Sequence, residues 1–291
     1  MTQQQKTEIQ QMAAQYVQQF SSQSKAVATL KGVSEATFIQ LLKGRWESIS
    51  EEMFISIGKQ VGYDAKGVWH LTETLAFNTI ITYLADAKEY SNVFALIANS
   101  GGGKSGTTDW YCGQSENAFV VSCAEYFNKK AFLQKMLEAM GKDGNGFTVT
   151  EMMDSIVDQI LRMKEPVFVF DEFDKLKEEV FLFFITLYNK LEDKCGIVLL
   201  GTSYLEKRIK RGVNLNKRGY SEIYSRIGRK CISIPAVSRK EIAEICEANG
   251  CSDQETISEI FNTCEGDLRR VKRAVHKYKL MQQRKSNNKA A

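Results

Sequence analysis

Three consecutive glycines near the middle of the chain are followed at once by a lysine and a serine, Gly101–Ser105. The apolar run Val93–Ala98 before them is typical of a buried strand. Because glycine tolerates positive φ angles, successive backbone N–H groups of such a turn can point toward one anion. Lys104 and Ser105 would then lie where a phosphate and a divalent cation are held. The spacing predicts phosphate binding at the end of this strand.

The stretch follows the P-loop pattern G-x-x-x-x-G-K-[ST] at every fixed position except the first, where Ala98 replaces glycine. In this motif the lysine reaches the terminal phosphates of a nucleotide and the serine hydroxyl holds Mg²⁺. A glycine turn after a buried strand, without any ligand, is the alternative. The residues expected to contact the nucleotide are Ser100, Gly101, Gly102, Gly103, Lys104, Ser105 and Gly106.

A second apolar run, 166–170, ends in two carboxylates, Asp171 and Glu172. Such a run is typical of a buried parallel strand, and ligands of parallel sheets collect at the carboxyl ends of the strands. We therefore predict that Asp171 holds Mg²⁺ together with Ser105, and that Glu172 orients or deprotonates a water molecule. The alternative for an acidic pair in this place is the N-cap of a helix.

Strands and helices alternate through the middle of the chain, which predicts an α/β fold with a parallel sheet and helices on both faces. Beyond the two runs above, we expect strands at 118–123, 196–201 and 230–234. A helix is expected at 150–163, with Thr150 as its N-cap. From Ser238 the chain is helical, and Ser238 with Glu241 has the form of a capping box. The predicted domains are a helical unit at 1–62, a nucleotide-binding domain at 63–236 and a helical lid with a basic tail at 237–291.

The N-terminal unit contains a stretch, 22–44, that resembles a helix-turn-helix of the phage-repressor type. Gly32 would form a left-handed turn, Ser34 would cap the second helix, and Phe38 and Leu41 would face the core. A helical hairpin used for protein contacts is the alternative. The second helix would present Thr37, Gln40 and Lys43 toward a DNA major groove.

Composition is that of an ordinary globular protein, with 43% hydrophobic and 25% charged residues. No apolar run approaches the roughly 18 residues that cross a bilayer, and the polar N-terminus is unlike a signal peptide. The seven cysteines lack C-x-x-C pairs and the two histidines lie far apart, so no zinc-site spacing is present. We expect a cytoplasmic, nucleoid-associated protein with reduced cysteines and no membrane partner.

Positive charge is concentrated in two segments. Residues 204–230 have a net charge of +7 and residues 269–291 a net charge of +9, which leaves −12 for the remainder. This asymmetry favours a polyanion partner, although solubilising surface charge is the alternative. The first segment lies inside the nucleotide-binding domain, and we predict that it binds double-stranded DNA through Lys207, Arg208, Lys210, Arg211, Lys217 and Arg218.

Three later features follow the P-loop and the acidic pair in a fixed order. Thr202 ends the 196–201 strand, which should lie between the P-loop strand and the Asp171 strand. Arg226 precedes the last strand, and Arg269 lies in the helical lid. The ordered set, over residues 67–280, resembles the AAA+ ATPases. The resemblance implies ATP and Mg²⁺ as cofactors, Glu172 as catalytic base, Thr202 as sensor 1, Arg226 as arginine finger and Arg269 as sensor 2. Ordinary basic surface is the alternative for both arginines.

Within that family, the helix-turn-helix in front, Trp69 with the helix after it, Gly201-Thr202 and the compact basic lid resemble the transposition ATPases of the MuB, TniB and IstB kind. The resemblance implies an ATP-driven homo-oligomer, a ring or helical filament, that coats DNA, selects the target site and activates a DDE transposase. A helicase loader or replication initiator is one alternative. A non-hydrolysing DNA-binding adaptor is another, which the Ala98 substitution keeps open.

Overall fold

The computed structural model describes residues 1, 3–18, 20, 22–63 and 69–290. The chain divides into two compact units, Met1–His70 and Leu71–Ala291. The predicted boundary between residues 62 and 63 borders residues 64–68, which lie outside the described residues. Among the residues described, no helix combines the length and the apolar composition that a bilayer crossing requires.

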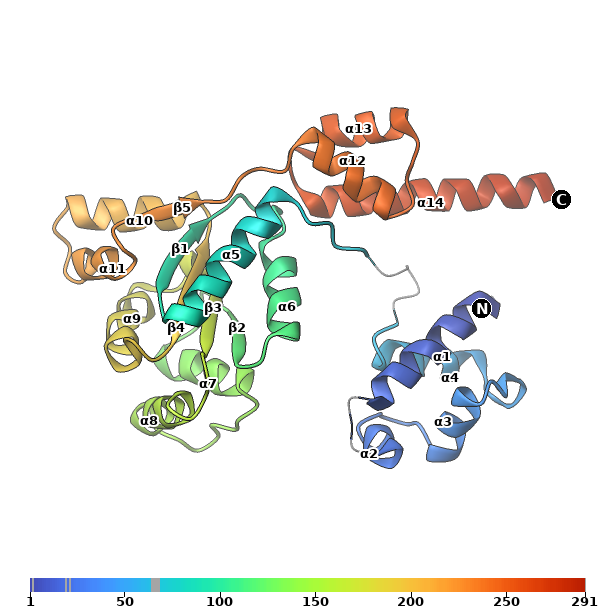
Figure 1. Ribbon diagram of the computed structural model, residues 1–291, viewed down its shortest axis with the longest axis horizontal. Helices are drawn as coiled ribbons and strands as arrows, with labels where there is room; N and C mark the ends of the chain where they lie inside the picture. The colour runs from blue at the N-terminus through green and yellow to red at the C-terminus, as the bar shows by residue number, and fades with distance from the viewer. Residues whose placement is uncertain (2, 19, 21, 64–68, 291) are drawn as a thin grey trace. The chain divides into compact units, whose positions relative to one another are not determined.

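A five-stranded parallel sheet forms the centre of the second unit, in the order β2-β3-β4-β1-β5 (Figure 1). All four strand pairs are parallel, and β4 lies between β1 and β3 as predicted. The register pairs Ile97 with Gly201, and Ser122 with Asp171, so these strand ends meet at one edge. The strands are β1 (Val93–Ile97), β2 (Ala118–Ser122), β3 (Val167–Asp171), β4 (Gly196–Gly201) and β5 (Cys231–Ser233).

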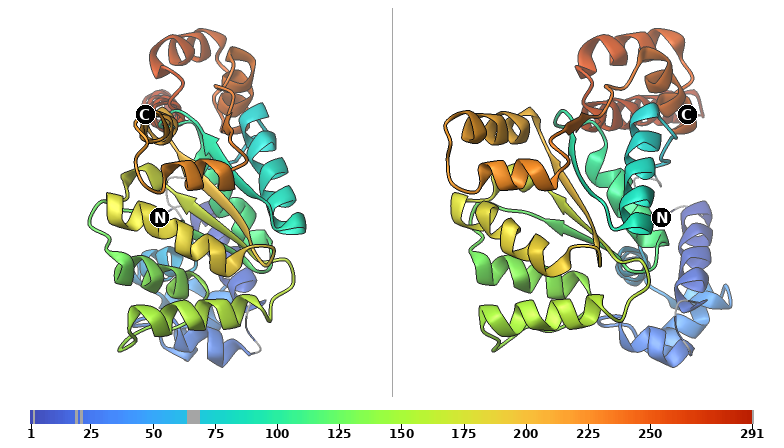
Figure 2. Two further views of the ribbon diagram at one scale, coloured as in Figure 1. Left: turned by 90° about the vertical axis from the view of Figure 1, so that its left-hand side faces the viewer. Right: turned by 60° about the vertical axis from the view of Figure 1, so that its left-hand side comes forward.

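Helices cover both faces of this sheet, which confirms the predicted α/β architecture (Figure 2). Residues of α5 and α6 pack with Val167 and Val169 on one face, and residues of α7 to α11 pack with Phe168 and Phe170 on the other. The alternation follows from the two-residue period of a strand. The helices are α5 (Leu75–Tyr90), α6 (Lys104–Gln114), α7 (Lys129–Ala139), α8 (Val149–Ile160), α9 (Glu178–Leu191), α10 (Ser203–Asn214) and α11 (Tyr220–Arg226).

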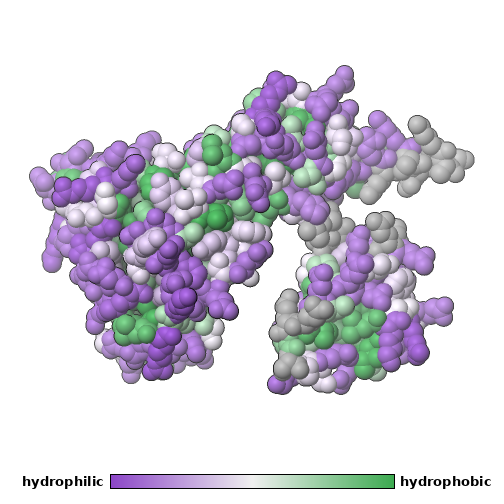
Figure 3. All heavy atoms as spheres, viewed as in Figure 1, coloured by the Kyte–Doolittle hydropathy of each residue, from purple (hydrophilic) through white to green (hydrophobic). Residues whose placement is uncertain are grey.

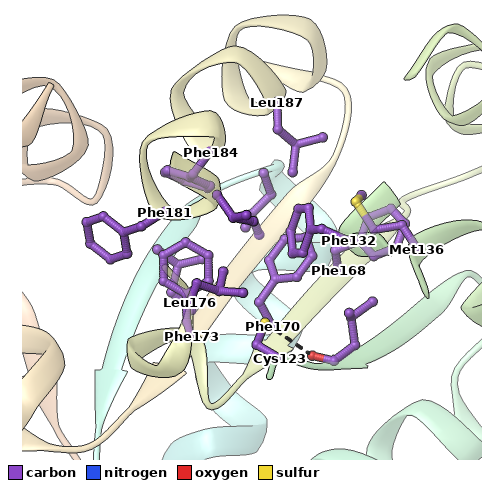
Figure 4. Packing of buried hydrophobic residues seen from close by; sticks show 14 of the residues in the cluster. Cys123, Phe132, Met136, Phe168, Phe170, Phe173, Leu176, Phe181, Phe184 and Leu187 are labelled. Carbon is purple, nitrogen blue, oxygen red and sulfur yellow. Dashed lines mark hydrogen bonds between the residues drawn. The ribbon is translucent and has the colours of Figure 1, made fainter. Parts of the chain in front are cut away.

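Aromatic rings fill the larger of the two layers (Figure 4). Phe168 and Phe170 of β3 stack with their ring centroids 5.7 Å apart, and Phe132 of α7 lies 5.1 Å from Phe170. Phe173, in the short helix η2 (Phe173–Lys175), continues the layer toward Phe181 of α9. All five side chains are fully buried. This packing fixes the path of the chain directly after Asp171, where the predicted acidic pair lies.

One predicted N-cap is wrong by two residues. The helix expected from Thr150 begins at Val149, and its N-cap is Thr148. Thr148 accepts a hydrogen bond from the backbone N–H of Glu151, and the Glu151 carboxylate accepts one from the backbone N–H of Thr148. The reciprocal bonds of this capping box favour Thr148, because Thr150 lacks a glutamate three residues later.

The C-terminal part of the chain forms a three-helix lid of α12 (Arg239–Ala248), α13 (Gln254–Cys264) and α14 (Leu268–Ala290). The predicted capping box of Ser238 and Glu241 is present at the start of α12. Glu241 also accepts a hydrogen bond from the backbone N–H of Leu75, at the start of α5. The lid is therefore attached to the sheet domain through the first turn of α5 as well as through the connecting chain.

The first unit consists of α1 (Gln3–Gln18), α2 (Gln23–Ala28), α3 (Glu35–Leu42), a short helix η1 (Trp46–Ser48) and α4 (Glu51–Gln60). Gly32 has a φ of 71° between α2 and α3, as the predicted left-handed turn requires. Ser34 caps α3, and Phe38 and Leu41 are fully buried. These local features of the predicted helix-turn-helix are present.

Candidate functional site

The glycine turn after β1 has the backbone geometry that phosphate binding needs. Gly101 and Gly103 have φ angles of 77° and 87°, which only glycine adopts without strain. Ala98 has no positive φ, and its side chain is buried in the layer beneath α5 and α6. The alanine at the first motif position is therefore compatible with the turn. Ser100 and Gly106, at the two ends of the predicted phosphate-binding stretch, are exposed.

Lys104 is buried at the first turn of α6, with 8% of its surface exposed. Its ammonium group donates hydrogen bonds to the backbone oxygens of Ala98, at 2.8 Å, and Asn99, at 2.9 Å. Burial lowers the pKa of Lys104, while the carboxylates of Asp171 and Asp174 act in the opposite direction. Because the Lys104 ammonium is buried and donates to neutral backbone oxygens, a phosphate bound beside it would strongly stabilise its positive charge.

Ser105 and Asp171 come together across the site. The Ser105 hydroxyl donates a hydrogen bond of 2.6 Å to Asp171 Oδ2, and Asp171 is 2% exposed. The other carboxylate oxygen accepts from the backbone N–H of Glu172 at 2.8 Å, which fixes its orientation. A hydroxyl and a carboxylate oxygen at this separation fit Mg²⁺, which takes few protein ligands and completes its shell with phosphate and water oxygens.

Glu172 follows β3 in the left-handed region, with a φ of 55°. Its carboxylate forms an ion pair of 2.7 Å with Lys175, one turn later. Because both side chains are partly exposed, the pair is weak and can separate. To act on a water molecule as predicted, the Glu172 carboxylate has to leave Lys175 and turn toward Asp171.

Thr202 follows the end of β4 and caps α10. Its hydroxyl donates a hydrogen bond of 2.7 Å to Asp174 Oδ2. Asp174 was missed by sequence reasoning, although it is the next acid after the predicted pair. The buried Phe173 turns the chain back, so that Asp174 reaches Thr202 and acts on the charge of Lys104.

A second missed carboxylate, Asp267, comes from the lid. A Cβ atom at position 101 would lie 2.2 Å from Asp267 Oδ1, so any residue larger than glycine there would displace the Asp267 side chain. The backbone N–H of Leu268 donates a hydrogen bond of 2.9 Å to the Gly101 oxygen. The predicted sensor residue Arg269 is exposed beside these contacts, close enough to act on the pKa of Lys104. The first turn of α14 thus lies directly on the glycine turn.

A third missed carboxylate is Asp109, one turn after Ser105 on α6. Partial burial and the nearby charge of Asp171 raise its pKa. Its negative charge therefore adds to that of Asp171. Its place four residues after Ser105 was the only available signal in the sequence.

Arg226, the predicted arginine finger, is not part of this site within one subunit. It lines a cavity of about 490 Å³ with Val93 and Ile232, near the amino ends of β1 and β5, whereas the glycine turn follows the carboxyl end of β1. Its guanidinium donates a hydrogen bond of 2.7 Å to Asn189 and lies 4.9 Å from the ring of Tyr188. Within this chain, Arg226 therefore lies at the other end of β1 from the predicted phosphate site.

Residues 87–209 match the family model of the AAA domain. The match covers β1 to β4 and most of α10, including the glycine turn and the strand-end carboxylates. The second unit has the AAA+ P-loop fold. No functionally curated protein matches the chain in sequence.

Solved structures resemble the chain only distantly. A structure of Drosophila ORC bound to DNA is 12% identical, with a TM-score of 0.49 over 76% of this chain and 59% of that chain. NtrX from Brucella abortus is 14% identical, with a TM-score of 0.47 over 85% of this chain and 58% of that chain. The chain thus spans less than two thirds of both proteins.

Of the six cations predicted to bind DNA from the second unit, one is held within the fold and five are exposed. Arg208 is 12% exposed at its side chain, pairs with Glu178 at 3.0 Å and stacks 3.9 Å above the ring of Phe181. Its guanidinium also donates to the backbone oxygen of Leu176 at 2.6 Å, so it holds α10 to α9 and is not a free surface cation. The remaining predicted residues are exposed: Lys207, Lys210, Arg211, Lys217 and Arg218. Among them, Lys210 forms an ion pair of 2.6 Å with Glu206.

Of the three residues predicted to face DNA from α3, two form hydrogen bonds within the first unit. Thr37 bonds to Ser34 at 2.7 Å, and Gln40 accepts from Ser48. Lys43 is exposed at the end of α3. Base reading by Thr37 and Gln40 would therefore require these local hydrogen bonds to be exchanged.

Proposed function

We propose that the chain is an ATP-dependent DNA-binding AAA+ ATPase. It forms oligomers on double-stranded DNA, selects a target site and activates a DDE transposase. The observation that carries the nucleotide part is the 2.6 Å contact of Ser105 with the buried Asp171, beside the buried Lys104. It brings the serine of the P-loop and the carboxylate of a neighbouring strand to one point, where Mg²⁺ and the terminal phosphates would be held.

Each residue then has a definite task. Lys104 binds the terminal phosphates, and Ser105 with Asp171 holds Mg²⁺, which would neutralise charge on the phosphates. Glu172 accepts a proton from the attacking water after leaving Lys175. Thr202, oriented by Asp174, positions that water, and Arg269 binds the terminal phosphate from the lid.

The place of Arg226 supports the proposed oligomer. Because it lies near the amino end of β1, it would complete a phosphate site only in a neighbouring subunit. Exposed cations between Thr202 and Arg226 would then face DNA close to the junction of two subunits. Target selection and transposase activation are the most specific part of the proposal. They rest on the resemblance of the N-terminal helix-turn-helix, of Trp69 with the helix after it, of Gly201-Thr202 and of the compact basic lid to transposition ATPases.

Steady-state ATP hydrolysis and nucleotide binding test the chemistry. We expect Lys104→Ala to lose ATP binding. We expect Glu172→Gln to bind ATP like the parent and to hydrolyse it on the order of 10²-fold or more slowly, because general-base catalysis contributes about that much. Lys175→Ala is the matched control, since it removes the partner of Glu172 but keeps the base. Parent-like turnover in Glu172→Gln would show that Glu172 is not the base.

Electron microscopy of the protein with duplex DNA and a non-hydrolysable ATP analogue tests the assembly. We expect rings or helical filaments on DNA for the parent and none for Lys104→Ala. Stimulation of a co-encoded transposase in vitro tests the last step, and stimulation of replicative-helicase loading instead would favour the loader alternative. A protein that assembles on DNA without ATP turnover would be the non-hydrolysing adaptor.

A further inference from the structure

One face of α14 carries a row of cations that the nucleotide site does not use. We call four of these residues the cation stripe: Arg270, Arg273, Lys277 and Arg284. At about 100° per residue, their positions fall within about 60° of one another around the helix. The first and the last are fourteen positions apart, or about 21 Å at a rise of about 1.5 Å per residue.

The opposite side of α14 is fixed in the lid. Val271 and Val275 are 0% and 1% exposed, and α14 packs on α12 and α13. The stripe therefore faces away from the lid core, and Arg273, Lys277 and Arg284 are exposed. Figure 3 shows mostly hydrophilic side chains over the α12–α14 region.

Few acidic side chains compensate the positive charge of the cation stripe. Arg270 pairs with Glu265 at 2.9 Å, and Glu265 is itself 78% exposed, so this pair is weak. Within the described part of the chain, Arg273, Lys277 and Arg284 form no ion pair, and no acid occurs from residue 269 to the end. Repulsion among unpaired cations is reduced when an extended anion lies along them.

A hollow of about 320 Å³ lies beside the stripe, between α13 and α14. Three stripe cations line it together with Thr263, and its floor includes Ile260 and Ala274. A phosphate group placed at this hollow would meet several donors at once, as charge-assisted recognition of phosphate requires.

We propose that the cation stripe is a binding surface for the phosphate backbone of duplex DNA, and that its occupancy is coupled to the P-loop. The proposal rests on the DNA-binding function proposed above and adds a surface to it that is separate from α10. A duplex presents about one charge per 1.7 Å of its axis, or about a dozen along the length of the stripe. A membrane fits less well, because an interfacial helix needs a continuous free apolar face. Val271 and Val275 of α14 are buried in the lid, and among the described side chains of this helix only Leu280 and Met281 are large, apolar and exposed.

The coupling follows from the first turn of the same helix. Leu268 donates a hydrogen bond to the Gly101 oxygen, and Asp267 lies against Gly101. Arg270, the first stripe residue, lies two positions after Leu268 on one continuous helix. A movement of α14 on binding DNA would therefore also change its contact with the glycine turn. By thermodynamic linkage, DNA would change the affinity for ATP by the same factor as ATP changes the affinity for DNA.

The test measures duplex binding against salt between about 50 and 200 mM. The variant combines Arg273→Ala, Lys277→Ala and Arg284→Ala, and the matched control combines Lys142→Ala, Lys164→Ala and Lys240→Ala, which removes the same charge from exposed sites elsewhere. We expect the stripe variant to flatten the slope of log K against log salt by up to about 2.7 units, at about 0.9 per phosphate contact, and the control to change it little. Equal melting temperatures would show that both variants are folded.

An unchanged slope in the stripe variant, or an equal loss in both variants, would overturn the proposal. So would binding of anionic phosphatidylserine vesicles through the stripe without duplex binding. A Lys210→Ala/Arg211→Ala variant separates the two proposals. If it alone loses duplex binding, the ATPase proposal stands and the stripe proposal fails. If the parent binds duplex through the stripe equally with and without ATP, the ATP-dependent function and the coupling fail, whereas the stripe remains a DNA surface. Lys104→Ala, which should not bind ATP, is the control that shows no ATP effect.

Nucleotide binding gives the second readout. We expect duplex DNA to change the ATP dissociation constant of the parent about fivefold or more, and to leave that of the stripe variant unchanged. Titration with a fluorescent, non-hydrolysable ATP analogue measures the dissociation constants of the parent and of the stripe variant without turnover. An equal DNA effect in parent and stripe variant would place the coupling elsewhere and overturn this part of the proposal.

Discussion

The two basic segments of the chain, 204–230 and 269–291, carry nearly the same excess of positive charge, +7 and +9. In the first, Arg208 is stacked on Phe181 and paired with Glu178, and Arg226 is bonded to Asn189. In the second, the described cations of the stripe beyond Arg270 have no acidic partner. The difference arises from neighbouring elements, because α9 places Glu178 and Asn189 against the first segment. Equal net charge therefore predicts neither equal accessibility nor equal function.

The largest effect is expected at Arg226. An arginine finger acting on a neighbouring subunit supplies roughly 10³-fold or more in rate, so Arg226→Ala should reduce ATP turnover by that order. Mixing Arg226→Ala with Lys104→Ala should partly restore turnover, because each subunit supplies what the other lacks. Steady-state hydrolysis over a range of mixing ratios measures this.

Asn189→Ala is the control for that experiment. It removes the hydrogen-bond acceptor of Arg226 but keeps the guanidinium, so turnover should remain near that of the parent. If no mixing ratio restores activity, the site is not shared between subunits, and Arg226 has only the structural role that its contacts show.

Arg269 should have the next largest effect. It is exposed beside Lys104, and a charge-assisted hydrogen bond to phosphate contributes about 1.5–3 kcal/mol. Arg269→Ala should therefore weaken ATP binding about tenfold or more in equilibrium titrations. Arg270→Ala, which removes the adjacent arginine paired with Glu265, is the control and should bind ATP without DNA like the parent. Equal loss in both would indicate a general effect of lid charge.

Arg208 tests the claim that part of the positive charge of the first segment is used within the fold. Arg208→Ala removes the stack on Phe181, the ion pair with Glu178 and the hydrogen bond to the Leu176 oxygen, while Glu178 keeps its hydrogen bond from Tyr220. The free energy of unfolding should fall by about 2 kcal/mol, measured by urea denaturation, with little change for the exposed Lys207→Ala. If Arg208→Ala were as stable as the parent, the structural role of Arg208 would be wrong, and its predicted role in DNA binding would stand.

Sequence reasoning predicted what depends on local pattern. The apolar runs marked the strands, the glycine turn was placed after β1, and the position of β4 between β1 and β3 is confirmed. Ser34 and Ser238 were correctly predicted as caps, because a cap is decided by residues within one turn. The same reasoning failed at Thr150, where two threonines compete and only Thr148 has a glutamate three residues later.

The missed residues depend on contacts between segments distant in the chain. Asp174 reaches Thr202 because Phe173 is buried among aromatic rings from α9 and β3. Asp267 lies on Gly101 although more than 160 residues separate them. Arg208 could not be distinguished from its exposed neighbours, since its partner Glu178 lies thirty residues upstream. No local pattern contains such pairings.

The smallest effect, and the one that separates the two segments most directly, is expected at Lys210 and Arg211. Both are exposed on α10, and only Lys210 has an acidic partner, Glu206, in a weak surface pair. If α10 lies on duplex DNA, neutralising both should flatten the slope of log K against log salt by up to about two units, for unrelated sequences alike.

Because Glu206 already compensates Lys210, Lys210→Ala alone should flatten the slope less than Arg211→Ala alone. Measuring both single variants in the presence of a non-hydrolysable ATP analogue tests this order. ATP should tighten duplex binding by ordering the junction between subunits, so the ATP effect should disappear in Lys104→Ala. An unchanged slope in the Lys210→Ala/Arg211→Ala double variant, together with a flattened slope in the stripe variant, would assign the DNA surface to α14 and leave α10 with its structural contacts alone.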